Sequence, residues 1–426
     1  MADIRPFRCI RPNKEVASVV AALPYDVYDR KEAKEVVKAN PRSFLAIDRA
    51  ETQFPDDFDM YDQRVYEKAR DMLKDWQDQG ILVSDQAECY YIYELTMDGR
   101  AQTGIVACAS IDDYLNGVIA KHENTREEKE LDRIRHVDVT GAHTGPIFLA
   151  YRSENELNKL VELKKGTPPL YSFVAEDGIT HRVWRVEEAG KIGRIQELFA
   201  KIPKVYIADG HHRAASAVKV GLKRRAEHPD YTGQEPFNYF LSVLFPDDQL
   251  MIMPYNRVVK DLNGLTKAEF MNRVQEIFRV EKRGRNAFQP EKLHHVAMYL
   301  DECWYELTVK PEYQSADPVK GLDVSILQDT LLGPVLGIDD PRTNNRIQFV
   351  GGIRGLGELE RLVKGAEVVN GEKCSEDRAH AVAFAMYPTS IQELFAVADA
   401  GLLMPPKSTW FEPKLRSGVV IHSFEE

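Results

Sequence analysis

The sequence predicts an α+β protein, and three observations support this expectation. Segments of strand composition are interspersed with amphipathic helical segments in no regular alternation along the 426 residues. The length allows two or three domains, and a hydrophobic content of 43% is typical of chains that bury a core. Beyond about residue 260 a second series of helices and strands begins, which indicates a further α+β unit.

The first elements are a long helix and a hairpin. Apolar residues recur at helical spacing over 56–79, and Gly80 ends the pattern in the manner of a glycine just beyond a helix. Two runs rich in β-branched and aromatic residues follow at 89–96 and 101–111, joined by an Asp98-Gly99 turn. We therefore expect a sheet to begin here.

The middle of the chain continues this sheet. A charged helix is predicted over 125–137, a strand is predicted to end in HRVWRV, and another helix is predicted over 192–200. We expect 238–259 to form a second hairpin, with its turn at Pro246-Asp247-Asp248, that completes the sheet.

These elements suggest three parts. Residues 1–85 form an N-terminal extension that packs on the core, 86–260 form the core, and 261–426 form a C-terminal α+β unit. The proline-containing tail of the last part is expected to be ordered but irregular and to return to the site.

Composition excludes several classes of function. A net charge of −11 argues against nucleic acid or an anionic membrane surface as a partner. The five cysteines show neither a CxxC pair nor zinc-like spacing, which favours a reducing compartment. We find no signal peptide and no apolar run of about 18 residues, so a cytoplasmic protein is expected.

One stretch, KVYIADGHHRAASAVKVG (204–221), has the pattern of a strand, a tight turn and a helix. A helix that begins after Gly210 would present free backbone N–H groups and the positive end of its dipole, with His211, His212 and Arg213 in its first turn. This corner suits an anion, above all a phosphate. The alternatives are that Asp209 caps the helix and the histidines are surface or packing residues, or that these side chains bind a metal ion.

A second cluster lies in AKHENTREEKELDR, where His122 and Glu123 follow a short apolar run and precede a helix. A carboxylate at such a corner can act as a general base. The alternative is an ordinary solvated helix, capped by Asn124 or Thr125 and stabilised by ion pairs along its surface. The sequence contains no Walker A lysine, protein-kinase signature, G-x-S-x-G or H-E-x-x-H motif.

Near the end of the chain, basic and hydroxyl side chains gather between prolines. This patch is either part of a site or a solvated tail, and it comprises Lys407, Ser408, Thr409, Lys414 and Arg416.

Five motifs in order resemble the domain-of-unknown-function family numbered ten-fifteen, over essentially the whole chain. They are LPYDVY, KHENT, IADGHHRAASA, NRVV and MPPKSTWFEPKLRSG. In the first, Asp26 either caps the following segment or takes part in the site. The central part of this family is similar to the ParB/sulfiredoxin-like fold and to free serine kinases of the ADP-dependent type. The resemblance therefore implies a mixed-sheet core and phosphoryl transfer to free L-serine.

The resemblance also assigns roles. His122-Glu123 matches the His-Glu pair that supplies the catalytic carboxylate of the serine kinases, and Asp209, Gly210, His212 and Arg213 match the loop that holds the nucleotide phosphates. It implies ADP or ATP as donor, serine or a similar metabolite as acceptor, and Mg²⁺, for which Asp209 is the candidate ligand. Two alternatives stay open: a phosphatase of a metabolite such as phosphoserine, and a ParB-like nucleotide-binding regulator without enzymatic activity.

Overall fold

The computed structural model describes residues 1–125, 127–364, 368–369, 372–373 and 381–424. Mixed α+β structure is confirmed, and the chain folds into two compact units. Unit 1 comprises Met1–Leu250 together with Pro413–Glu426, and unit 2 comprises Met251–Glu412. The division therefore precedes the expected boundary at 260, and the last residues of the chain belong to unit 1.

Unit 1 is built on a nine-stranded mixed sheet in the order β6-β11-β8-β12-β5-β4-β10-β9, with β1 pairing to β5. The predicted hairpin is confirmed as β4 and β5, and its turn has positive φ at Asp98 (51°) and Gly99 (78°), as a two-residue hairpin turn requires. The strands are β1 (Ile4–Arg5), β4 (Tyr90–Met97), β5 (Arg100–Ser110), β6 (Ile119–Ala120), β8 (Ile147–Tyr151), β9 (Tyr171–Val174), β10 (Thr180–Val186), β11 (Val205–Asp209) and β12 (Tyr239–Pro246).

The second predicted hairpin, over 238–259, is wrong. Both edges of β12 are occupied within unit 1, by antiparallel β5 and parallel β8, so no edge is left for the following strand. That strand, β14 (Tyr255–Val259), instead pairs within unit 2. The intervening turn is held to unit 1, since the amide of Ser153 donates to Oδ1 of Asp247 at 2.9 Å.

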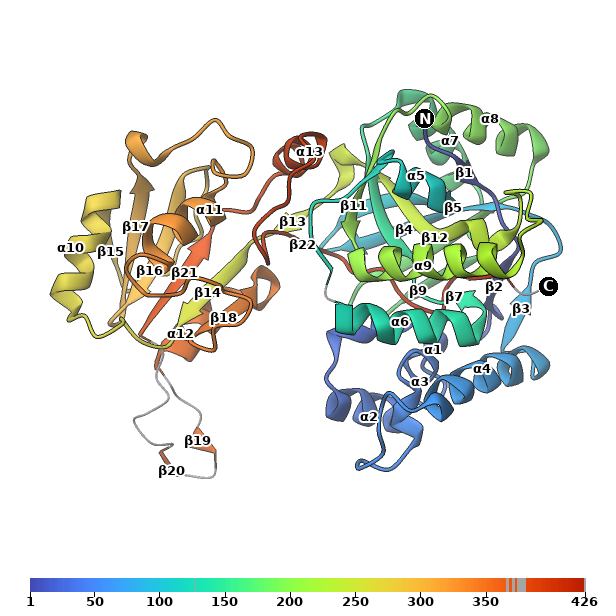
Figure 1. Ribbon diagram of the computed structural model, residues 1–426, viewed down its shortest axis with the longest axis horizontal. Coiled ribbons are helices and arrows are strands. Elements are labelled where there is room, and N and C mark those ends of the chain that lie inside the picture. The colour runs from blue at the N-terminus through green and yellow to red at the C-terminus, as the bar shows by residue number, and fades with distance from the viewer. Residues whose placement is uncertain (126, 365–367, 370–371, 374–380, 425–426) are drawn as a thin grey trace. The chain divides into compact units, whose positions relative to one another are not determined.

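Helices cover the sheet of unit 1, and three of them form a layered stack (Figure 1). α6 packs against α9 on one side and α4 on the other. The helices predicted over 56–79, 125–137 and 192–200 correspond to α4, α6 and α8. The helices of unit 1 are α1 (Ala17–Val20), α2 (Arg30–Ala39), α3 (Leu45–Asp48), α4 (Gln63–Asp78), α5 (Ile111–Leu115), α6 (Glu127–Thr140), α7 (Asn155–Lys165), α8 (Ala189–Phe199) and α9 (His211–Glu227), with 3-10 turns η1 (Tyr25–Val27), η2 (Ala50–Gln53), η3 (Pro236–Asn238) and η4 (Asp247–Gln249).

The N-terminal residues and the end of the chain share one hydrophobic core. Phe44 and α3 are fully buried against α4, and Ile421 from the last strand joins the same cluster. Gly418 (φ 78°) lies so close to Phe44 that a Cβ would stand 2.3 Å from its ring, so the tail is packed tightly here. A small sheet in the order β3-β2-β23-β7 ties these segments together; its strands are β2 (Cys9–Pro12), β3 (Leu82–Ser84), β7 (Ala142–His143) and β23 (Ile421–Ser423).

Unit 2 contains an antiparallel sheet in the order β15-β17-β16-β21-β14-β18 and a core around Trp304. Its further strands are β13 (Ile252–Met253), β15 (Phe278–Gly284), β16 (His295–Leu300), β17 (Cys303–Val309), β18 (Ile347–Gly351), β19 (Val368–Val369), β20 (Glu372–Lys373), β21 (Val382–Met386) and β22 (Trp410–Phe411). Its helices are α10 (Lys267–Ile277), α11 (Asp323–Leu327), α12 (Leu356–Lys364) and α13 (Ile391–Asp399), with shorter turns η5 (Pro311–Tyr313), η6 (Gln328–Leu332) and η7 (Gly352–Arg354).

The structure also describes the cysteines and the lengths of the helices, on which two expectations from composition depended. The four described cysteines are buried and free, and Cys374 lies outside the described residues. Within the described ranges, every helix is too short or too polar to cross a bilayer.

Candidate functional site

The two sequence clusters meet at one edge of the large sheet because β6 and β11 are parallel neighbours. Ile119 pairs with Val205, and Ala120 pairs with Tyr206. The carboxyl ends of parallel strands lie at the same side of a sheet. The residues after β6, including His122 and Glu123, therefore emerge beside the start of α9.

Direct contacts join the clusters. The rings of His122 and His211 pack edge to face, with centroids 4.5 Å apart. Oε2 of Glu123 lies 3.9 Å from Nδ1 of His211, and the Glu123 side chain is 42% exposed. A partly exposed carboxylate thus stands beside the first residue of α9.

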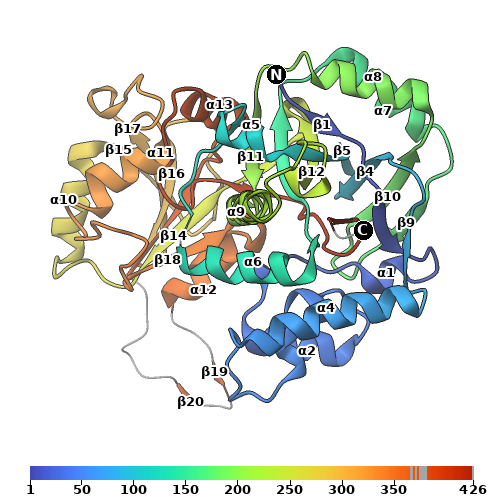
Figure 2. The same ribbon diagram turned by 45° about the vertical axis from the view of Figure 1, so that its right-hand side comes forward.

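The start of α9 has the geometry of an anion-binding corner. Gly210 occupies the N-cap position with φ 94°, a conformation that glycine adopts without strain, and no side chain caps the helix. The alternative in which Asp209 caps the helix is therefore wrong. The first amides of an α-helix have no partner within the helix, so those that follow Gly210 can donate to a ligand. Figure 2 views α9 nearly end-on, with α6 beneath it.

Two cations flank Asp209 at this point. Nη2 of Arg213 lies 3.0 Å from Oδ2 of Asp209, and Nζ of Lys414 lies 3.6 Å from Oδ1. Nη1 of Arg213 also donates to the carbonyl of Pro146. Burial raises the pKa of Asp209, but Lys414 and Arg213 outweigh it and hold the pKa at about 2. We call Asp209, Gly210, Arg213 and Lys414 the anion corner.

The two buried histidines are not cations at neutral pH. Burial lowers the pKa of His122 to about 4, and burial together with His122 lowers the pKa of His211 well below its ordinary value. Nδ1 of His122 and Nε2 of His211 accept or donate no hydrogen bond among the described residues. His211 therefore supplies no positive charge to this corner at neutral pH. His212 is half-buried in the same turn.

The corner does not fit a protein-held Mg²⁺. Both oxygens of Asp209 face cations, which compete with a metal ion for the same lone pairs. Within the described residues, no three His, Cys, Asp or Glu side chains gather closely enough to hold a metal. Asp209 instead positions Arg213 and Lys414.

The other predicted residues are placed in two different regions. Arg416 is buried and binds Asp177 and His181 (Nε to Nε2, 3.3 Å), so its guanidinium is engaged at β10. Asp26 is exposed in η1, next to Tyr25.

Lys407, Ser408 and Thr409 belong to unit 2. There Oγ of Ser408 donates to the carbonyl of Pro405 at 2.6 Å, and the Lys407 ammonium lies 5.4 Å from the centre of the Tyr255 ring.

Sequence reasoning missed a polar region beside Arg213. A cavity of about 30 Å³ is lined by Arg213, Tyr25, Asp48, Arg133 and His136, among others. The last four also line a second cavity of about 180 Å³. The spacing of Arg133 and His136 on one helix face was visible in the sequence, whereas nothing there linked them to Asp48.

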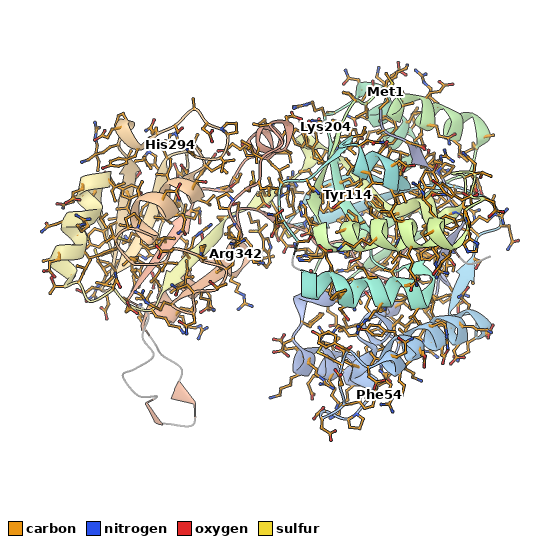
Figure 3. The ribbon with its side chains drawn as sticks, in the orientation of Figure 1. Met1, Phe54, Tyr114, Lys204, His294 and Arg342 are labelled. Carbon is orange, nitrogen blue, oxygen red and sulfur yellow. The ribbon has the colours of Figure 1, made fainter. Side chains whose placement is uncertain are left out.

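A third cavity lies elsewhere in unit 1. Its volume is about 300 Å³, and it is lined by Arg152, Lys201, Lys204 and Tyr206 with their neighbours. Lys204, labelled in Figure 3, precedes the amino end of β11, whereas α9 follows its carboxyl end. This cavity is therefore separate from the anion corner.

The family resemblance is confirmed. The family described as "Protein of unknown function (DUF1015)" matches residues 4–325, and the chain belongs to this family. No curated protein matches the sequence.

Solved structures show distant similarity. C-terminally truncated SbnI from Staphylococcus aureus is 10% identical, with a TM-score of 0.36 over 73% of this chain and 85% of SbnI. A free serine kinase in complex with AMP is 14% identical, with a TM-score of 0.34 over 74% of this chain and 91% of that one. A conserved hypothetical protein from Pyrococcus furiosus is 14% identical, with a TM-score of 0.34 over 76% of this chain and 96% of that one.

Proposed function

We propose that this protein is a nucleotide-dependent kinase of a small metabolite, with ADP or ATP as donor and free L-serine as the first acceptor to test. The observation that supports the proposal is the meeting of Glu123 with the start of α9. A carboxylate able to accept a proton stands 3.9 Å from the residue that follows Gly210, next to the anion corner. A base beside a phosphate cradle is the arrangement that phosphoryl transfer to a hydroxyl needs.

The residues divide the reaction between them. The first amides of α9, Arg213 and Lys414 bind the terminal phosphate of the nucleotide and stabilise the charge on its oxygens. The acceptor hydroxyl oxygen forms a bond to the terminal phosphorus, while the bond from that phosphorus to the bridging oxygen breaks. Its electron pair leaves with the shortened nucleotide, and the hydroxyl proton passes to Glu123. The products are a phosphoester and AMP from ADP, or ADP from ATP.

His122 and His211, buried and neutral, have a positioning role in this reaction. They fill the space between β6 and α9, and Nδ1 of His211 faces Glu123. They position the carboxylate rather than neutralise phosphate. Arg213 and Lys414 carry the positive charge.

Glu123→Gln tests the proposal. Purified protein is incubated with L-serine, MgCl₂ and ADP or ATP, and phosphoserine is measured by mass spectrometry. We expect the variant to lose at least 100-fold in turnover, because an amide cannot accept the proton, and to bind ADP as the wild type does. Glu227→Gln, at the exposed far end of α9, is the matched control.

Other results would replace the proposal. Full turnover in Glu123→Gln would remove that residue from catalysis. Release of phosphate from phosphoserine without nucleotide would indicate a hydrolase. Binding of ADP with no transfer to any small hydroxyl compound would indicate a nucleotide-binding regulator.

A further inference from the structure

The second cavity beside Arg213 is lined by ionisable groups of both signs. Its walls come from the N-terminal residues and from α6, and its volume of about 180 Å³ is room for roughly six waters. Four carboxylates and two guanidiniums line it, so negative charge is in excess: Asp26, Asp48, Glu51 and Asp132 against Arg49 and Arg133. We call it the acidic cavity.

Both arginines of the acidic cavity already have partners. Nε of Arg49 lies 2.5 Å from Oε1 of Glu51, and its Nη1 donates to two backbone carbonyls. Arg133 pairs with Asp132 at 2.9 Å and stacks 4.1 Å from the centre of the Tyr25 ring. Each pair neutralises its own two charges, and Arg133 also interacts electrostatically with Asp48, whose backbone carbonyl lies 3.4 Å from Nη1 of Arg133.

These pairs leave two carboxylates over, exposed Asp26 and buried Asp48. Asp48 is 2% exposed, and the one described hydrogen bond to its carboxylate comes from Oγ1 of Thr144 to Oδ1 at 2.7 Å. No ion pair with Asp48 is formed within the described part of the chain. Arg133 forms its ion pair with Asp132, so Asp48 shares that charge at longer range and would stabilise a cationic ligand in direct contact with it.

His136 does not supply this charge. It lines the cavity near Asp48, and its Nε2 lies 3.2 Å from the carbonyl of Ile47. Burial and the neighbouring Arg133 charge lower the pKa of His136 to about 4. The ring is therefore neutral at physiological pH.

The acidic cavity adjoins the smaller cavity that reaches Arg213 of the anion corner. Tyr25, Asp48, Arg133 and His136 line both this cavity and the smaller one that reaches Arg213. A ligand held near Asp48 would therefore lie on the Arg213 side of α9. The oxygen atoms of a phosphate bound at the anion corner would lie next to that ligand.

We propose that the acidic cavity binds the acceptor, and that this acceptor is a small hydroxyl compound with a primary ammonium group, held by Asp48. The assignment rests on the proposed kinase function, because the bound phosphate defines the side from which the hydroxyl approaches. Amino alcohols and small hydroxyl amino acids have this chemistry.

Calorimetric titration in the presence of ADP tests the assignment with three probes. Ethanolamine and L-serine carry an ammonium group, whereas ethylene glycol has a hydroxyl in its place. We expect ethylene glycol to bind at least tenfold more weakly than ethanolamine. Asp48→Asn should weaken ethanolamine binding at least tenfold and leave ADP affinity unchanged. Asp56→Asn, which changes an exposed carboxylate of the same region, is the matched control.

A second variant distinguishes loss of the binding site from loss of the fold. Met60 lines the acidic cavity and is half-exposed, so Met60→Trp fills space without removing a charge. It should also abolish ethanolamine binding, with an unchanged circular dichroism spectrum. Equal binding of ethylene glycol, or wild-type ethanolamine affinity in both variants, would overturn the assignment.

The same measurements separate this inference from the proposed function. If phosphoserine forms but Asp48→Asn leaves the KM for serine unchanged, the cavity assignment fails and the kinase stands. If ethanolamine binds through Asp48 but ADP does not bind, the amine site stands and the kinase fails.

Discussion

Asp209 is a carboxylate inside a site that we propose for anions, and its contacts explain its presence there. It holds Arg213 at 3.0 Å and Lys414 at 3.6 Å, two residues far apart in the sequence. Its low pKa keeps it ionised, so it fixes the direction of both cations before a ligand arrives. Such preorganisation lowers the cost of binding a phosphate.

Arg213→Ala is the residue-scale prediction. We expect at least tenfold weaker ADP binding, because a charge-assisted hydrogen bond to phosphate is lost, and a smaller loss for Lys414→Ala, whose ammonium lies further from Asp209. Fluorescence titration with a labelled ADP measures both. Arg194→Ala, at an exposed ion pair on α8, is the control. Unchanged ADP affinity in Arg213→Ala would contradict the assignment of phosphate binding to the anion corner.

At the scale of elements, the turn between β11 and α9 depends on one glycine. Gly210 has φ 94°, and a Cβ there would stand 3.1 Å from Cζ of Arg213. Any other L-residue would strain the backbone and press on the guanidinium. The turn therefore determines both the start of the helix and the position of its arginine.

Gly210→Ala should lower the free energy of unfolding by about 1–2 kcal/mol, the cost of a left-handed conformation for a residue with a Cβ. Urea denaturation measures this change. Gly193→Ala provides the comparison: it lies inside α8 with open space around it, and alanine there should stabilise by up to about 1 kcal/mol. If Gly210→Ala stabilised the protein as Gly193→Ala is expected to do, this account of the turn would be contradicted.

Local sequence patterns predicted individual helices, strands and turns better than they predicted which strands pair. The β4–β5 hairpin and the β11–α9 turn depend on neighbouring residues, and both were predictable. The pairing of β6 with β11 depends on a strand of two residues, too short to leave a periodic pattern. The wrong hairpin at 238–259 has the same origin, because strand partners are chosen by the whole sheet.

The candidate site was predictable to a similar degree. Glu123 and Arg213 stand in recognisable sequence contexts, and the structure places them around one helix start. The neutrality of His211 follows from burial, which composition does not reveal. Asp48 approaches Thr144 only through the packing of the N-terminal region on the sheet, and no spacing in the sequence indicates that contact.

At the scale of the whole molecule, buried histidines make the fold sensitive to acid. Burial lowers the pKa of both His122 and His422 to about 4, below the value of about 6.5 expected when unfolded. Between these values the unfolded chain binds more protons than the folded one, so stability falls as pH decreases. We expect the loss to begin near pH 6.5 and to continue towards pH 4, which urea denaturation over that range measures.

Replacement of one such histidine checks the cause. His422→Asn keeps a polar side chain of similar size and cannot titrate, so it should make the fall in stability between pH 6.5 and 4 less steep than in the wild type. His228→Asn, at an exposed position after α9, should leave the slope unchanged. An identical slope in all three proteins would assign the acid sensitivity to other groups.

The return of residues 413–426 to unit 1 has a consequence for biosynthesis. A ribosome makes Glu123 and Arg213 long before Lys414, and all of unit 2 is translated in between. β2 and Phe44 pack against β23 and Gly418, which are synthesised last. The surface that β2 and Phe44 offer to them therefore stays uncovered on the nascent chain. The anion corner consequently acquires its lysine only after translation has passed unit 2, and partly made chains lack that cation.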